Sequence, residues 1–249
     1  MSTSQAEAPA ASGSNPAGMN SPALATAWGT ARLAAAALVL AAIVAQAERT
    51  IGGAIEAGRD VTTTVVNFFS FFTILSNTLS VAVLAAAGVW IIAARRGSTR
   101  EPRALAIALA CVSTYMIVTG IVYNLLLRGV ELPQGATVWW SNEVLHVVGP
   151  LFLLADVLLR IRHRSLSWGA IGAVLVFPLA WSAYTMIRGP LVTNPVTGAA
   201  WWYPYPFLDP HLTPGGYLGV AAYVVGIALA IGGVAWFAVW RRRSGGSRD

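Results

Sequence analysis

The sequence predicts an all-α, polytopic membrane protein, a bundle of six transmembrane helices with both termini on the cytoplasmic side. Of its 249 residues, 56% are hydrophobic and only 10% are charged. A soluble chain of this length would need a larger polar surface around its core, whereas lipid tolerates an apolar exterior. Each span must be helical because unpaired backbone groups are costly in lipid, and the sequence lacks the alternation of a membrane barrel.

Six apolar segments are long enough to cross a hydrocarbon core of ~30 Å. We expect these spans at residues 28–47, 65–93, 104–127, 138–159, 168–187 and 216–240. They form a transmembrane domain over residues 26–240, followed by a basic cytoplasmic tail over residues 241–249. Residues 1–25 are rich in Ala, Ser, Gly and Pro, and this composition predicts a disordered N-terminal tail.

The first span has a second interpretation. Arg32, the apolar run that follows it and the triplet Ala45-Gln46-Ala47 together imitate a signal peptide with its cleavage site. The polar leader before Arg32 is long for a signal peptide, so we favour a retained span. Cleavage would leave the topology of the other spans unchanged.

The arginines predict the orientation of the bundle. All 16 basic residues are Arg, and most of them lie in residues 95–103, 160–164 and 241–248. The opposite loops contain Arg49, Arg59, Arg128 and Arg188. By the positive-inside rule, the Arg-rich segments and both termini are cytoplasmic. We therefore attribute the net charge of +6 to topology. The expected partner is the lipid bilayer, and we expect no nucleic-acid partner. The oligomeric state stays open.

This orientation places the long loop over residues 189–215 on the outer side. The loop contains the stretch WWYPYPFLDP, and Trp139 and Trp140 lie on the neighbouring loop. These aromatics are typical of an interfacial belt at the outer face of the membrane. The prolines favour a stiff, ordered cover over a flexible linker.

Polar residues inside two spans fall at the same predicted depth. Thr73 lies ~12 Å along the second span and His146 ~12 Å along the fourth, at ~1.5 Å of rise per residue. Ser70, Thr73, Asn77 and Ser80 have the spacing of one helix face, a pattern that packing between helices also explains. An ionisable residue such as His146 inside a span is by default a functional candidate.

Other polar residues of the spans have simpler interpretations. Asp156 precedes Arg160 by four positions, which predicts an ion pair on one helix face near the cytoplasmic boundary. On the third span, four polar residues could line a cavity with Thr73 and His146: Tyr115, Thr119, Tyr123 and Asn124. Tyrosines near an outer boundary are as often belt residues, so Tyr115 and Tyr123 have this second interpretation.

A hydroxyl and an imidazole at one depth suggest nucleophilic catalysis. His146 would remove the proton of Thr73 as its oxygen attacks a carbonyl carbon, and water activated by His146 would hydrolyse the acyl-enzyme. Asn77 and Asn142 offer amide donors for an oxyanion, and Glu143 could orient or charge-stabilise the imidazole. This chemistry needs no cofactor. A site within the bilayer favours a lipidic ester substrate that enters sideways from the membrane.

Three motifs resemble one known family. They are F-T-x-L-S-N-T at residues 72–78, Asn142-x-x-x-His146 followed by Gly149-Pro150, and Y-P-F-L-D at residues 205–209. In these motifs the chain is similar to the androgen-induced and androgen-dependent membrane proteins and their bacterial six-span relatives. The resemblance implies a multi-pass hydrolase of fatty acid esters of hydroxy fatty acids in a bacterial cell membrane. It assigns the nucleophile to Thr73 and its histidine partner to His146.

Two other classes of function stay open. A zinc-dependent membrane hydrolase could use Glu143, His146, Asp209 and His211, although the sequence has no tight pair such as H-x-x-x-H. A non-catalytic membrane protein could use the same polar stripe to bind or transport a small lipophilic ligand. The spans show no duplicated halves of the kind that many transporters contain.

Overall fold

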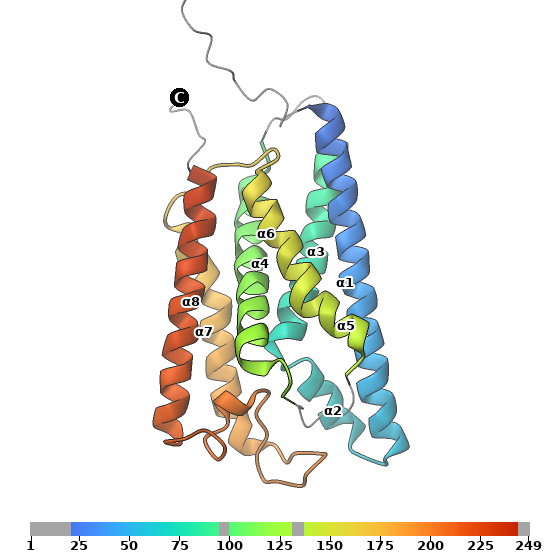
Figure 1. The fold of residues 1–249 in the computed structure, drawn as a ribbon, viewed down its shortest axis with the longest axis vertical. Helices are drawn as coiled ribbons and strands as arrows, with labels where there is room; N and C mark the ends of the chain where they lie inside the picture. The colour runs from blue at the N-terminus through green and yellow to red at the C-terminus, as the bar shows by residue number, and fades with distance from the viewer. Residues whose placement is uncertain (1–20, 95–99, 131–136, 244–249) are drawn as a thin grey trace, which may run out of the picture.

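The described part of the chain forms an all-α bundle, as the sequence predicts. The computed structural model describes residues 21–94, 100–130 and 137–243. Six of its helices are long and apolar enough to cross a membrane, and no strand occurs among these residues. Figure 1 shows the long helices packed roughly side by side, with the start of the first and the end of the last at the same end.

The helices follow one another along the chain with two regular segments of π-helix. Their bounds are α1 (Pro22–Glu56), α2 (Val61–Phe68), α3 (Phe72–Ala93), α4 (Arg103–Val122), α5 (Trp139–Glu143), α6 (Gly149–Leu159), α7 (Ala170–Arg188) and α8 (Tyr217–Arg243). A π-turn over Tyr123–Leu127 extends α4, and a second over Val144–Val148 joins α5 to α6. Short 3-10 turns occupy Gly189–Leu191 and Pro206–Leu208.

The first helix is longer than predicted at both ends. Its N-cap is Ser21, whose hydroxyl accepts a hydrogen bond from the Leu24 amide at 3.2 Å, and Pro22 occupies the first turn. Residues 22–25, which we assigned to the tail, therefore begin α1, whereas residues 1–20 lie outside the described residues. At the other end of the chain α8 continues to Arg243, and residues 244–249 again lie outside the description.

The predicted span over residues 65–93 is interrupted. The chain forms α2 first, leaves the helical path with Phe71 in an extended conformation, and restarts as α3. Proline and glycine are absent from this break. A contact from a distant helix stabilises the break instead. The Trp181 indole of α7 donates a hydrogen bond to the Ser70 carbonyl at 2.9 Å. The interruption thus depends on tertiary contacts, and the local sequence does not predict it.

Asp60 fixes the start of α2. Its carboxylate accepts hydrogen bonds from the amide and the hydroxyl of Thr63 at 3.1 and 2.6 Å. These two bonds hold the pKa of Asp60 below its ordinary value. A charged N-cap of this kind suits the positive end of the helix dipole.

A buried ion pair joins α1 to α6. Arg32 donates from Nε and Nη2 to the two carboxylate oxygens of Asp156, at 2.8 and 3.1 Å, and neither side chain is exposed. The Trp28 indole adds a third hydrogen bond to Asp156 at 2.6 Å. The predicted pair between Asp156 and Arg160 is therefore wrong. Arg160 ends α6 with a φ of 55°, which turns it away from the helical path.

Close packing of α1 on α3 depends on two glycines. A Cβ on Gly29 would lie 2.4 Å from a side-chain carbon of Ile91, and a Cβ on Gly88 would lie 2.8 Å from the Gly29 carbonyl oxygen. Small residues of this kind let membrane helices approach each other at the backbone.

The outer loop between α7 and α8 is an ordered cover with a largely buried aromatic interior. In Figure 1 it lies across the end of the bundle opposite to the described chain ends. Its buried side chains are Trp202, Tyr203, Tyr205, Phe207 and Leu208. These residues pack into the protein and do not form the expected belt, whereas Trp139 and Trp140 are exposed, as belt residues should be.

Replacing Arg32 with Ala should lower the free energy of unfolding by about 3–5 kcal/mol, because it leaves the buried carboxylate of Asp156 without its counter-charge. Chemical denaturation of the protein in detergent measures this loss. The matched control is Arg49→Ala, which removes an exposed arginine from the same helix and should change stability by less than about 0.5 kcal/mol. Equal effects of the two changes would contradict the structural role of the ion pair.

Candidate functional site

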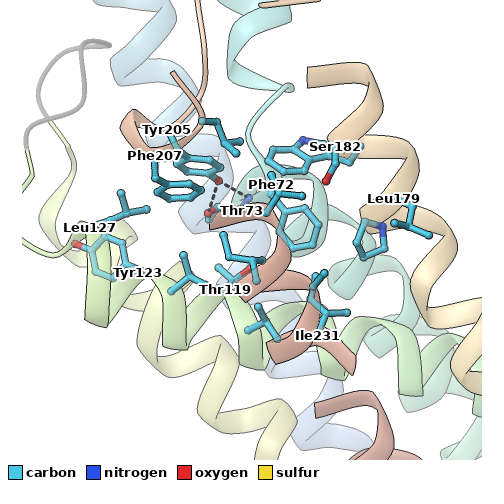
Figure 2. A pocket seen from close by; sticks show the side chains of 18 of the residues that line it. Phe72, Thr73, Thr119, Tyr123, Leu127, Leu179, Ser182, Tyr205, Phe207 and Ile231 are labelled. Atoms are coloured by element: carbon cyan, nitrogen blue, oxygen red, sulfur yellow. Dashed lines mark hydrogen bonds between the residues drawn. The ribbon is translucent and has the colours of Figure 1, made fainter. Parts of the chain in front are cut away.

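Two cavities meet at Thr73. The first encloses about 840 Å³, its open mouth included, and lies between α3, α4, α7, α8 and the outer loop. Figure 2 shows its wall, which is mostly aliphatic and aromatic and includes Phe72, Thr73, Thr119, Tyr123, Leu127, Leu179, Ser182, Tyr205, Phe207 and Ile231. A cavity of this size and lining is in the range that holds a small organic ligand.

The second cavity is more polar. It encloses about 750 Å³, its mouth again included, and its lining contains the side chains of Gln46, Thr50, Asn142 and His146. The two cavities share four lining residues, namely Thr73, Tyr123, Leu127 and Tyr205. The Thr73–Tyr205 pair therefore stands in the wall between an apolar space and a polar one.

Thr73 lies in the first turn of α3, where backbone amides have no partner within the helix. The Tyr205 hydroxyl accepts a hydrogen bond from the Thr73 amide at 3.1 Å, and the hydroxyls of the two residues are 3.2 Å apart. Figure 2 shows both bonds as dashed lines. A tyrosine from the outer loop thus caps a helix that has no cap of its own.

Tyr205 is the site residue that sequence reasoning missed. The motif Y-P-F-L-D contains it, but the motif gave no role to the phenol. Burial raises the pKa of Tyr205 above its ordinary value, and its hydrogen bonds to Thr73 act in the opposite direction. The phenol is therefore protonated at neutral pH, and it contributes a hydroxyl and no charge.

His146 is held in one tautomer. Its Nδ1 lies 2.9 Å from the backbone carbonyl oxygen of Asn142. A carbonyl oxygen can only accept a hydrogen bond, so Nδ1 carries the proton and Nε2 carries the lone pair of the neutral ring. The Tyr123 ring stacks on the imidazole, with centroids 3.8 Å apart and planes 22° from parallel. Backbone and aromatic contacts thus hold the ring with Nε2 as its hydrogen-bond acceptor.

His146 lies within the second π-turn, and residues of the first π-turn contact it. The Asn124 amide, in the π-turn after α4, donates to the carbonyl oxygens of Gly120 and His146 at 2.8 and 3.3 Å. The Asn142 amide of α5 donates to the Tyr123 hydroxyl, which connects α5 to the first π-turn through side chains. Single π-turns in membrane and soluble helices are frequent at functional sites, because they redirect side chains that an α-helix would point elsewhere.

The structure brings Thr73, His146 and Asn142 to the second cavity. No hydrogen bond joins Thr73 to His146 among the described contacts, and the Thr73 hydroxyl bonds Tyr205 instead. On the third span, Thr119 and Tyr123 line a cavity, whereas the Tyr115 hydroxyl bonds the Val174 carbonyl at 2.8 Å and contributes to packing.

Two predicted supporting residues lie elsewhere. Asn77 is fully buried, lines neither cavity, and donates to the carbonyl oxygens of Thr73 and Leu145 at 2.9 and 3.3 Å. Its amide connects α3 to the second π-turn and is not placed as an oxyanion donor. Glu143 pairs with Arg128 at 3.1 Å near the surface, so its carboxylate does not orient the imidazole as expected. The Asn142 carbonyl has that function.

The proposed zinc ligands do not converge. Within residues 21–94, 100–130 and 137–243, no group of three His, Cys, Asp or Glu side chains is placed to hold a metal ion. Asp209 and His211 contact each other at 3.0 Å in the outer loop, where His211 also stacks on Trp201.

A scan against protein-family models, a search of curated proteins and a search of solved structures each found no significant match to this chain.

Replacing Gly120 with Ala should displace the His146 backbone without touching either cavity. The new Cβ would lie 2.9 Å from Cβ of Pro150 and 3.2 Å from the His146 carbonyl oxygen, in a tight contact between α4 and α6. We expect a loss of about 1–3 kcal/mol in unfolding free energy. A Cβ on Gly52 of α1 meets nothing within 4 Å, so Gly52→Ala should be neutral or stabilising. A neutral Gly120→Ala would show that this contact is loose.

Proposed function

We propose that this chain is an intramembrane hydrolase of long-chain fatty acid esters, with Thr73 as nucleophile and His146 as general base. The observation that supports it best is the position of the Thr73 hydroxyl, in the wall between an apolar cavity and the polar cavity that contains His146. The three sequence motifs support the same assignment, because they resemble a family of membrane hydrolases. The resemblance to its bacterial members also favours a bacterial cell membrane.

The two cavities suit the two parts of an ester substrate. The apolar cavity would bind the acyl chain, since aliphatic and aromatic residues surround it. Two of its lining residues, Leu179 of α7 and Ala228 of α8, are also exposed on the apolar outside of the bundle. An acyl chain could enter there from the lipid. The polar cavity would admit water and the hydroxyl-bearing product.

The reaction would proceed through an acyl-enzyme. With ester bound, Nε2 of His146 accepts the Thr73 proton as Oγ1 bonds to the carbonyl carbon, and the carbonyl electron pair moves to its oxygen. Collapse of this intermediate breaks the ester C–O bond, and His146 returns the proton to the leaving alkoxide. Water then repeats these steps on the acyl-Thr73 ester, releasing the fatty acid. Free enzymes often have looser catalytic contacts than their substrate complexes.

Tyr205 and the start of α3 would serve the oxyanion. The phenol lies within hydrogen-bond distance of Thr73 Oγ1, and it can donate to an oxygen that forms beside it. α3 is 22 residues long, so its N-terminus presents the positive end of a helix dipole at Thr73. These groups would replace Asn77, which the structure places away from both cavities.

Non-catalytic binding of a lipophilic ligand is the second candidate function. The observation that favours it is the absence of a hydrogen bond between Thr73 and His146 among the described contacts, beside a cavity fit for an apolar molecule. A protein of this class would bind a long-chain lipid with or without the Thr73 hydroxyl.

A fluorophosphonate, which traps activated hydroxyl nucleophiles, distinguishes the two functions. We expect wild-type protein in detergent to be labelled and to hydrolyse long-chain esters, and both activities to fall at least ~100-fold in Thr73→Ala and His146→Ala. Thr73→Ser should retain labelling because it keeps the hydroxyl.

The matched control for this experiment is Thr78→Ala. Thr78 lies in the same helix, bonds the Ile74 carbonyl at 2.7 Å and lines neither cavity, so its loss should leave labelling unchanged. Folding of each variant is checked by its melting temperature. Unlabelled wild type without esterase activity, or equal labelling in Thr73→Ala, would exclude the hydrolase.

Filling the mouth of the apolar cavity should change chain-length preference. Ala228→Trp places an indole where we expect the acyl chain, so hydrolysis of long-chain esters should fall by ~10-fold or more while hydrolysis of short-chain esters is largely retained. Ala222→Trp is the control, since Ala222 is exposed on the same helix and does not line the cavity. Equal losses for all chain lengths would place the acyl chain elsewhere.

A further inference from the structure

Four arginines and one histidine lie together at the inner end of the bundle, opposite to the outer loop. This group consists of Arg32 of α1, Arg160 and His163 after α6, and Arg241 and Arg242 at the end of α8. Arg32 and Arg242 are almost fully buried and form the floor of the group. Arg160, His163 and Arg241 are partly exposed at its rim, although Nε of Arg160, Nε of Arg241 and the ring nitrogens of His163 are themselves buried.

Acidic side chains do not balance this charge within the described residues. Asp156 is paired with Arg32, and Glu101 is paired with Arg242 at 2.5 Å. The described ion pairs include no carboxylate for Arg160 or Arg241. Arg241 donates to the Leu158 carbonyl at 3.0 Å. The group therefore has more cations than anions, in a place where buried charge is costly without a counter-charge.

Several buried donors also have no hydrogen-bond partner among the described residues. They are Nη1 of Arg32, Nε of Arg160, Nε of Arg241, and Nε and Nη2 of Arg242. One acceptor of the same group, Oε2 of Glu101, also has no partner among the described residues, so the unpaired donors outnumber the unpaired acceptor by five to one. Buried polar groups are almost always satisfied, and this excess of N–H donors indicates a missing acceptor. Guanidinium groups are the donors that match the geometry of phosphate oxygens.

His163 lies among these arginines as a neutral side chain. Both of its ring nitrogens lack a partner in the described structure. Burial lowers the pKa of His163 to about 2, and the charges of Arg242, Arg32, Arg160 and Arg241 add to this effect. The imidazole is therefore neutral at physiological pH and adds a further donor without adding charge.

Arg160 has an unfavourable backbone conformation in this group. Its φ of 55° is the left-handed conformation that usually ends a helix with glycine. A non-glycine residue there is strained. Arginines that only set topology need to lie on the cytoplasmic side, and they need neither this conformation nor burial.

We propose that this inner group is a binding site for a phosphate anion, presented by an anionic phospholipid of the inner leaflet or as free phosphate. The site requires no hydrolase activity and stands independently of the proposed function. Its chemistry is that of basic pockets between membrane helices, which take lipid phosphates on the cytoplasmic side.

The test measures the melting temperature of the full chain in a neutral detergent with four additions. These are phosphatidylglycerol in mixed micelles, phosphatidylcholine in mixed micelles, inorganic phosphate, and KCl at matched ionic strength. We expect saturating phosphatidylglycerol to raise the melting temperature of wild type by about 5–10 °C over phosphatidylcholine. A rise with inorganic phosphate over KCl would identify free phosphate, and a rise with the lipid alone would identify the headgroup.

Arg160→Gly is the informative variant, because glycine relieves the left-handed strain while the guanidinium is lost. Its melting temperature without ligand should equal or exceed that of wild type, and its ligand-induced rise should fall by more than half. Arg160→Asn, which also tolerates this conformation, repeats the test. Arg49→Gln, on the outer half of α1, should keep the full rise. A full rise in both Arg160 variants, or no rise in wild type with either phosphate ligand, would overturn the proposal.

Discussion

A helix that begins inside a membrane protein must find partners for its first amides, and the site of this protein depends on that constraint. The chain breaks between α2 and α3, so α3 starts among buried residues with no cap from its own side chains. The Tyr205 hydroxyl supplies the missing acceptor and holds the Thr73 amide. The same contact fixes the outer loop on the bundle and places the Thr73 hydroxyl between the two cavities.

The helical spans were predictable, because the lipid environment requires them. Length and apolar character predict six helices, because these follow from the cost of exposing polar groups to hydrocarbon. The arginine distribution predicts which side of the membrane each loop faces, and that orientation stays a prediction. The break at residues 69–71 was not predictable, since a tryptophan more than a hundred positions later satisfies it. The partner of Asp156 was wrong for a similar reason. Arg160 has the right spacing, but the contact between α1 and α6 supplies Arg32.

The candidate site was predictable in part. Counting the rise per residue along the second and fourth spans predicted that Thr73 and His146 lie at one depth. In the structure both residues line the second cavity. Residue spacing could not predict the direction of side chains near the π-turns and the helix break. In the structure Glu143 pairs with Arg128, and the Asn77 amide bonds to backbone carbonyls. Tyr205 lies far along the chain in a loop whose aromatics looked like a membrane belt. Only the folded loop shows that its phenol reaches a helix start.

Identification of the labelled atom tests the assignment of Thr73 most directly. Wild-type protein would be reacted with a fluorophosphonate that has a hexadecyl chain, digested, and analysed by mass spectrometry of the modified peptide. We predict a single adduct on Thr73, with the alkyl chain in the apolar cavity in a structure of the adduct. An adduct on another residue, with Thr73 unmodified, would contradict the assignment of Thr73 as the nucleophile.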